Sequence, residues 1–166
     1  MNRILSIFVS LCFAGAAFAQ TPDLISRTGL VGIWQNTPYV AAGWNDSHLF
    51  YADGRAVFAF NQMDVFKRLL RREGTWTLEG STLTVTYTRE LVIVGGKINK
   101  NAADGEDGIE GGKDTWRTLA KPIVARFNLS SIQGPRKNQY GDGAWSVLFD
   151  KKRFYKMNGD PKEYGD

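Results

Sequence analysis

The stretch "EGTWTLEGSTLTVTYT", residues Glu73 to Thr88, alternates apolar and polar side chains on both sides of Gly80 and Ser81. A period of two places alternate side chains on opposite faces of a strand. Threonine and aromatic residues favour a pleated sheet, and glycine tolerates the positive φ angle of a two-residue turn. The stretch therefore predicts an antiparallel hairpin with one buried face, which consists of Trp76, Leu78, Leu83, Val85 and Tyr87.

Similar patterns on either side predict two further hairpins. "HLFYADGRAVFAF" turns at Asp53-Gly54, and "WSVLFDKKRFYKM" turns near Asp150 to Lys152. Three more segments, "LVGIWQ", "LVIV" and "PIVARFNLS", have the composition of short strands. About eight short strands with local connections predict an all-β fold, either an antiparallel barrel or a sandwich.

The segment "NQMDVFKRLLRRE" interrupts this alternation. Wound as a helix, it places its apolar residues on one side and its charged residues on the other. Asn61 suits an N-cap, and the basic residues near the end suit the helix dipole. The pattern predicts one short amphipathic helix from Asn61 to Arg72. Its charged face is either an ordinary solvated surface or a contact for an anionic membrane surface, and its basic residues are Lys67, Arg68, Arg71 and Arg72.

The first 19 residues have the three parts of a secretion signal. Arg3 supplies a positive charge, an apolar run follows from Ile4 to Phe13, and Ala17 and Ala19 form a small-x-small cleavage pattern. The apolar run is shorter than the roughly 20 residues that span a bilayer, although a membrane anchor is the alternative interpretation. We expect a secreted or periplasmic protein with a signal peptide at 1–19, a single domain at 20–166 and no transmembrane segment after cleavage.

The charge and the reactive residues limit the classes of function that fit the sequence. The formal net charge is +4, and acidic and basic residues mix along the chain, which indicates general solubility and no binding to nucleic acid. His48 is the only histidine. Its neighbour Ser47 would point to the opposite face of a strand, so His48 is interpreted as a partly exposed strand residue. We see no catalytic set and no metal motif, and we expect no cofactor; an enzyme is the least favoured reading.

Residues 95–114, "GGKINKNAADGEDGIEGGKD", are rich in glycine and acidic residues. This composition predicts a long loop. Its carboxylates could bind calcium, but their spacing does not follow the EF-hand order, so a solvated loop is favoured. The acidic residues are Asp104, Glu106, Asp107, Glu110 and Asp114.

Three of these segments together resemble a known group of proteins. Gly32-Ile33-Trp34, "FYADGRAVF" and "GTWTLEGSTLTVT" resemble the lipocalin-like families of secreted bacterial proteins within the calycin group, over residues 30–88. The resemblance implies an up-and-down β-barrel of about eight strands. It also implies that Gly32 and Trp34 close one end of the barrel with a cation from near the last strand. Arg153 is the expected cation, with Lys152 and Lys156 as alternatives.

The inward aromatic residues of such a barrel either fill its interior or line one small cavity. The connection "TPYVAAGWNDS" could place Tyr39 and Trp44 over the mouth. The favoured function is therefore binding of a small apolar or amphipathic molecule. An envelope interaction module or structural module with a filled barrel is the alternative. The candidate ligand-binding residues are Trp44, Phe58, Trp76 and Tyr87.

Overall fold

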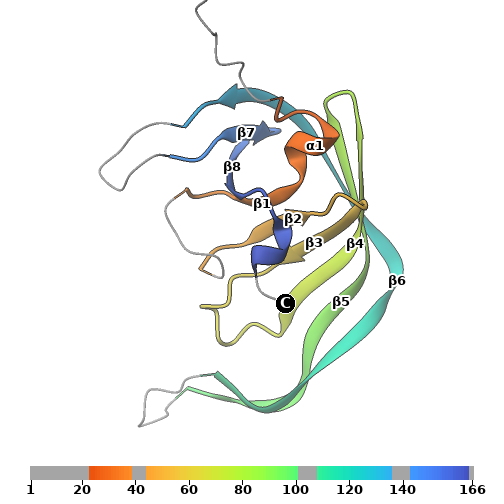
Figure 1. Ribbon diagram of the computed structural model, residues 1–166. Helices are drawn as coiled ribbons and strands as arrows, with labels where there is room; N and C mark the ends of the chain where they lie inside the picture. Colours follow the sequence, from red (N-terminus) through yellow and green to blue (C-terminus); the bar gives the residue numbers. More distant parts are fainter. Residues whose placement is uncertain (1–22, 39–43, 101–107, 136–142, 165–166) are drawn as a thin grey trace, which may run out of the picture.

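The computed structural model describes residues 23–38, 44–100, 108–135 and 143–164. Within these ranges, eight strands form one antiparallel sheet in which each strand pairs with the next along the chain (Figure 1). β1 also pairs with β8, so the sheet closes into a ring. The signal peptide expected at 1–19 lies outside the described residues. The strands are β1 Gly32–Gln35, β2 Ser47–Phe50, β3 Arg55–Ala59, β4 Leu69–Glu79, β5 Thr82–Asn99, β6 Gly108–Gln133, β7 Ser146–Phe149 and β8 Lys152–Asn158.

The three predicted hairpins are confirmed. Gly80 and Ser81 connect β4 to β5, and Gly80 has a φ of +57°. Gly54 turns between β2 and β3 with a φ of +92°, and Asp150 turns between β7 and β8 with a φ of +54°. Glycine and aspartate are the residues that adopt this left-handed region at the lowest cost. Turn chemistry and alternation were thus sufficient to predict these pairings.

The amphipathic helix predicted from Asn61 to Arg72 is wrong. β4 begins at Leu69, and the preceding residues form turns. The Phe60 N–H donates to the Leu70 carbonyl over 3.0 Å, and the Ile93 N–H donates to the Arg68 carbonyl over 2.7 Å. Pairing with β3 and β5 therefore overrides the local helical pattern.

The described helices are short. α1 spans Arg27–Leu30, and the 3-10 helix η1 spans Pro161–Tyr164. Ser26 caps α1 by accepting the Gly29 N–H on its hydroxyl over 3.0 Å. Neither of these helices, nor any other in the described ranges, is long and apolar enough to cross a membrane.

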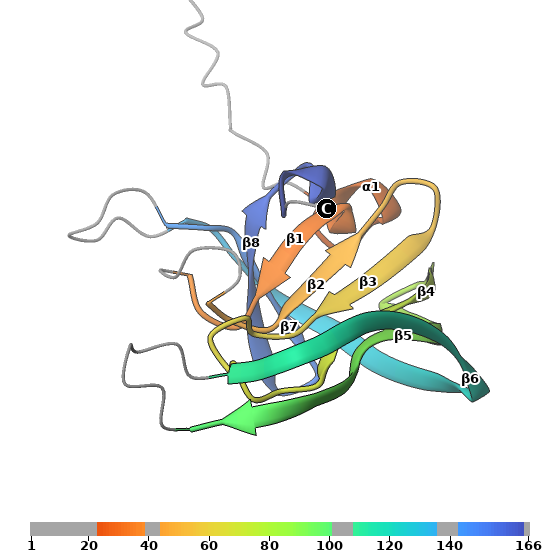
Figure 2. The same ribbon diagram turned by 90° about the horizontal axis from the view of Figure 1, so that it is seen from below.

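The loop predicted at 95–114 is wrong over most of its length. Residues 95–99 end β5 and residues 108–114 begin β6, with Gly95 paired to Gly112 and Lys97 paired to Glu110. β5 and β6 continue side by side beyond the shorter strands (Figures 1 and 2). Asp104, Glu106 and Asp107 lie outside the described residues.

One row of paired residues crosses the inner face of six strands. Trp34 on β1 pairs with His48 on β2, and His48 pairs with Phe58 on β3. The row continues through Arg72, Glu90 and Arg117 on β4, β5 and β6. The inner surface therefore changes from aromatic to charged as the strands succeed each other.

Trp34 joins the sheet to α1. Its side chain is fully buried, and its indole N–H donates to the Leu30 carbonyl over 2.8 Å. The ammonium of Lys156 lies 5.8 Å from the centre of the Trp34 ring and donates to the Gly29 carbonyl over 2.7 Å. Both side chains thus hold the C-terminal end of α1 over one end of the closed sheet. Burial lowers the pKa of Lys156.

Arg153 does not take the position expected for it. Its guanidinium donates to the Ser131 carbonyl over 2.8 Å and to the Ser146 hydroxyl over 3.1 Å. Lys156, one of the alternatives, is the cation at Trp34 instead. Gly32 has a φ of +136°, and a Cβ there would lie 2.3 Å from the Asn158 carbonyl oxygen, so glycine allows β8 to approach β1 closely.

Candidate functional site

A cavity of about 510 Å³ lies at the end of the ring where β7 turns into β8. This volume falls in the range of about 300–1,000 Å³ that is typical of small-molecule sites. Its wall is aromatic and its rim is polar. The wall consists of His48, Phe58, Phe127, Phe149 and Phe154, and the rim consists of Asn36, Asn45, Asp46, Asp150, Lys151 and Lys152.

His48 is the one polar residue of the wall. Only 7% of its surface is exposed, so the expectation of a partly exposed histidine is wrong. The imidazole centre lies 4.7 Å from the Phe58 ring centre and 5.3 Å from that of Phe154. Its Nδ1 atom is buried and has no hydrogen-bond partner in the part of the chain that the structure describes. The register of β1, β2 and β3 explains the burial, because it places His48 between Trp34 and Phe58.

The environment keeps this imidazole neutral. Burial lowers the pKa of His48 from 6.5 to about 4, while Asp46 acts in the opposite direction and Lys152 adds to the lowering. A neutral imidazole carries one N–H donor and one acceptor nitrogen. The cavity therefore offers an uncharged hydrogen-bonding group inside an aromatic wall.

Two lysines stand at the rim. Lys152 pairs with Phe149 across β7 and β8, which places both residues on the inner face. Its ammonium lies 5.6 Å from the centre of the Phe154 ring. Within the described ranges, neither Lys151 nor Lys152 takes part in an ion pair. Both ammonium groups are thus available to an anion at the mouth.

The two rim carboxylates are used in local structure. Asp46 accepts the Asn61 N–H over 2.9 Å, and Asp150 accepts the Asn128 N–H over 2.8 Å, each through Oδ1. These bonds hold the connections at the rim. One oxygen of each carboxylate is therefore committed to the backbone.

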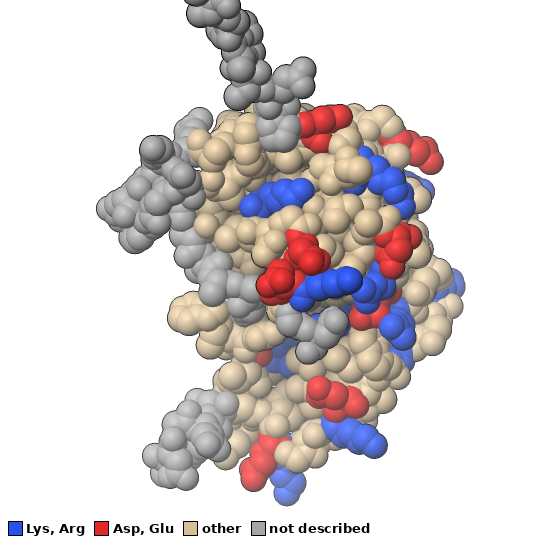
Figure 3. All heavy atoms as spheres, viewed as in Figure 1, with Lys and Arg blue, Asp and Glu red and all other residues tan. Residues whose placement is uncertain are grey.

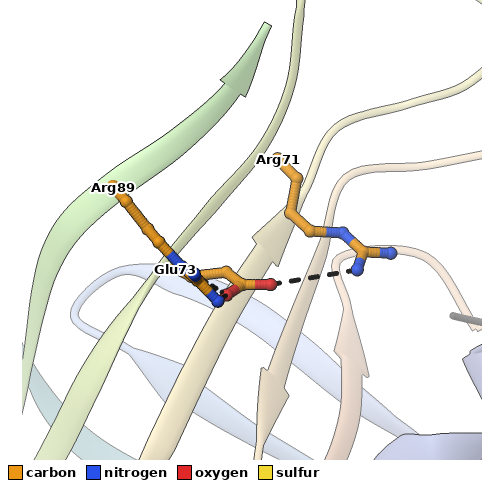
Figure 4. A network of polar contacts seen from close by, with 3 residues as sticks. All are labelled: Arg71, Glu73 and Arg89. Atoms are coloured by element: carbon orange, nitrogen blue, oxygen red, sulfur yellow. Dashed lines mark hydrogen bonds and ion pairs between the residues drawn. The ribbon is translucent and has the colours of Figure 1, made fainter. Parts of the chain in front are cut away.

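Two buried carboxylates lie in β4 and β5, away from this cavity. Glu73 accepts the Arg89 Nε–H over 2.9 Å, and Arg71 lies 3.9 Å away on its other side (Figure 4). Glu90 is held in the same way by Arg72 and Arg117. Both glutamates are buried, so the paired arginines offset the cost of removing their charges from water.

The basic residues expected to contact an anionic surface do not form one face. Strand alternation sends Arg71 and Arg72 to opposite sides of β4, where each meets a different glutamate. Arg68 donates to the carbonyls of Ile93, Gly95 and Gly96, and the Lys67 ammonium lies 4.7 Å from the Phe60 ring centre. Lysine and arginine are interspersed with acidic residues on the face that Figure 3 shows. Contact with an anionic membrane stays a prediction.

Of the four expected ligand-binding residues, Phe58 lies in the cavity wall. Trp44 is 61% exposed and is not part of the wall. Trp76 packs against Phe50 in the core, and its indole N–H donates to a backbone carbonyl over 3.0 Å. Tyr87 is also a core residue, and burial raises its pKa. Tyr39, the other expected lid residue, lies outside the described residues.

Several wall residues were not among the sequence-based candidates. Most of them had a signal in the sequence, because alternation in "PIVARFNLS" and in the last hairpin places them on inward faces, whereas His48 lies in a different hairpin and was interpreted as partly exposed. Alternation cannot show which part of an inward face stays open, since that depends on strands distant in sequence. The residues missed in this way are the wall residues His48, Phe127, Phe149 and Phe154 and the rim residue Lys152.

In the described ranges, no three His, Cys, Asp or Glu side chains gather in a way that would hold a metal ion. Comparisons of the chain with protein-family models, curated proteins and solved structures found no match. The chemistry of the cavity is therefore the basis for inferring a function.

Proposed function

We propose that this chain is an exported, lipocalin-like, up-and-down β-barrel that binds a small apolar or amphipathic molecule in the cavity at His48. The observation that carries the proposal is an aromatic-walled cavity whose one polar wall residue, His48, is buried with an unpartnered Nδ1. A buried polar atom without a partner costs about 1–3 kcal/mol, and a ligand that bonds to it recovers that cost. Ligand sites typically combine an apolar wall with a few polar groups that set orientation.

The wall is sufficient for measurable affinity. A one-ring molecule that hides about 150 Å² of apolar surface gains roughly 4 kcal/mol at about 25 cal/mol per Å². A hydrogen bond to His48 adds about 1 kcal/mol, and immobilisation removes part of the gain. The gross gain of about 5 kcal/mol corresponds to a dissociation constant of about 0.2 mM, so we expect small aromatic compounds to bind with dissociation constants of about 0.2 mM or weaker.

The test is a thermal-shift and tryptophan-fluorescence screen of fatty acids, quinones and small aromatic compounds. A compound that binds the native state raises the melting temperature as its concentration increases. Phe58→Ala should weaken the binding of any hit because Phe58 lines the cavity. Phe60→Ala is the matched control, because Phe60 packs on Phe58 but lines a different hollow.

A screen in which no compound class shifts the transition contradicts ligand binding. The alternative, an envelope interaction module or structural module, then takes its place. Export is tested separately by expressing the whole chain and determining the mass of the exported product. We expect cleavage after Ala19, so that the mature chain begins at Gln20.

A further inference from the structure

Two polar groups of the cavity lie close to one aromatic ring. The imidazole centre of His48 lies 5.3 Å from the centre of the Phe154 ring, and the Lys152 ammonium lies 5.6 Å from the same centre. Because both groups lie against the same ring, they are at most about 11 Å apart. A ligand that contacts both must be short and must carry a polar group at each end.

The inner end selects an uncharged group. Five aromatic ring centres lie within 6.1 Å of the His48 imidazole, so an ion placed there would lose most of its hydration. The neutral imidazole needs a partner that can donate to, or accept from, a ring nitrogen. A hydroxyl group can do both, whichever nitrogen carries the proton.

The middle of the cavity selects a flat apolar body. The rings of Phe149 and Phe154 lie 4.6 Å apart, and those of Phe127 and Phe149 lie 5.7 Å apart. Aromatic rings prefer tilted or edge-to-face neighbours with centres about 4.5–7 Å apart. These wall rings contact one another, and a benzene ring that lies in the cavity beside them extends the same kind of packing.

The outer end selects an anion. The ammonium groups of Lys151 and Lys152 have no ion pair within the described ranges, whereas Asp46 and Asp150 each hold a backbone N–H. A carboxylate at the rim keeps part of its hydration and gains two nearby cations, although the carboxylates of Asp46 and Asp150 at the same rim reduce that gain. A charge-assisted hydrogen bond of this kind is about twice as strong as a neutral one.

We propose that the cavity takes a one-ring aromatic hydroxy acid, with its hydroxyl at His48, its ring among the phenylalanines and its carboxylate at Lys151 and Lys152. This assignment rests on the proposed function, because it names the class of molecule that fills the same cavity. It predicts that each end of the ligand contributes separately to affinity.

Three matched compounds test the two ends by calorimetry and by NMR of the single histidine. 4-Hydroxycinnamate has both polar groups, cinnamate lacks the hydroxyl, and 4-hydroxycinnamyl alcohol lacks the carboxylate. We expect 4-hydroxycinnamate to bind about tenfold more tightly than either of the others, since each lost hydrogen bond is worth roughly a factor of ten. Its addition should also shift the imidazole resonances of His48.

Variants assign each preference to a residue. His48→Phe keeps an aromatic ring but removes both nitrogens, so 4-hydroxycinnamate and cinnamate should then bind equally. Lys151→Met with Lys152→Met should remove the preference for 4-hydroxycinnamate over the alcohol. Lys162→Met is the matched control, because Lys162 is exposed on η1 and is not part of the cavity, and it should leave all three affinities unchanged.

The outcomes separate this inference from the proposed function. Equal affinities for the three compounds, or preferences that persist in the variants, overturn the hydroxy-acid assignment and leave a general apolar site. Tighter binding of the alcohol than of the acid also overturns it. If none of the three binds and the apolar reference ethylbenzene does not bind either, both proposals fail.

Discussion

The burial of His48 predicts a specific loss of stability in acid. The unfolded chain should protonate its imidazole near pH 6.5, whereas the folded chain does so only at a pKa of about 4. Between these values the unfolded state binds more protons, so the free energy of unfolding falls as the pH is lowered. The full stability contribution is present above pH 6.5 and is lost by about pH 4. One pKa unit corresponds to 1.36 kcal/mol, so the total loss is about 3 kcal/mol.

The measurement compares the native protein with His48→Phe by urea unfolding at intervals from pH 4 to 7.5. Phenylalanine fits the aromatic surroundings and does not titrate, so subtracting the two curves removes the effect of the other acidic groups. We expect the difference in unfolding free energy to be constant above pH 6.5 and to change by about 1.4 kcal/mol per pH unit below it.

An NMR titration provides a direct check, because His48 is the only histidine and its ring signals need no assignment among others. An imidazole that titrates near pH 6.5 in the folded protein would refute the reasoning. The reasoning would also be refuted if the unfolding free energies of the two proteins changed in parallel as the pH is lowered.

Three further predictions concern stability and can be measured by urea or thermal unfolding. Trp34→Ala should lower the free energy of unfolding by roughly 3–5 kcal/mol, as large core truncations do. The losses from Trp34→Ala and Lys156→Met should be less than additive in the double variant, because both side chains hold α1. An unchanged melting temperature in Trp34→Ala would contradict this role. Gly74→Ala should lower the free energy of unfolding far more than Gly80→Ala, because a Cβ at Gly74 would lie 1.8 Å from a backbone oxygen of β5. A Cβ at Gly80 meets no other atom within 4 Å, so that substitution costs only about 1–2 kcal/mol for its positive φ. Equal losses of stability in the two variants would argue against the close approach of β4 and β5. Glu90→Gln should destabilise the folded protein by about 1–3 kcal/mol, because Arg72 and Arg117 lose the buried carboxylate that they contact. An unchanged stability would show that these ion pairs contribute nothing to it.

The sequence determined the local parts of the fold. Period-two alternation and the turn residues at Gly54, Gly80 and Asp150 predicted three hairpins that the structure contains. These signals are local, because a turn brings together residues that are already neighbours along the chain. The inward direction of Phe58, Trp76 and Tyr87 followed from the same alternation.

Only the tertiary structure decided what depends on partners distant in sequence. The segment from Asn61 to Arg72 has a helical pattern, but β3 and β5 take its backbone hydrogen bonds and make its end a strand. Lys156 replaces Arg153 at Trp34 because the register of β1 and β8 places it there. His48 became a buried cavity residue for the same kind of reason. Alternation shows which side of a strand faces inward, but only the packing of all the strands shows where the interior is filled and where it stays open.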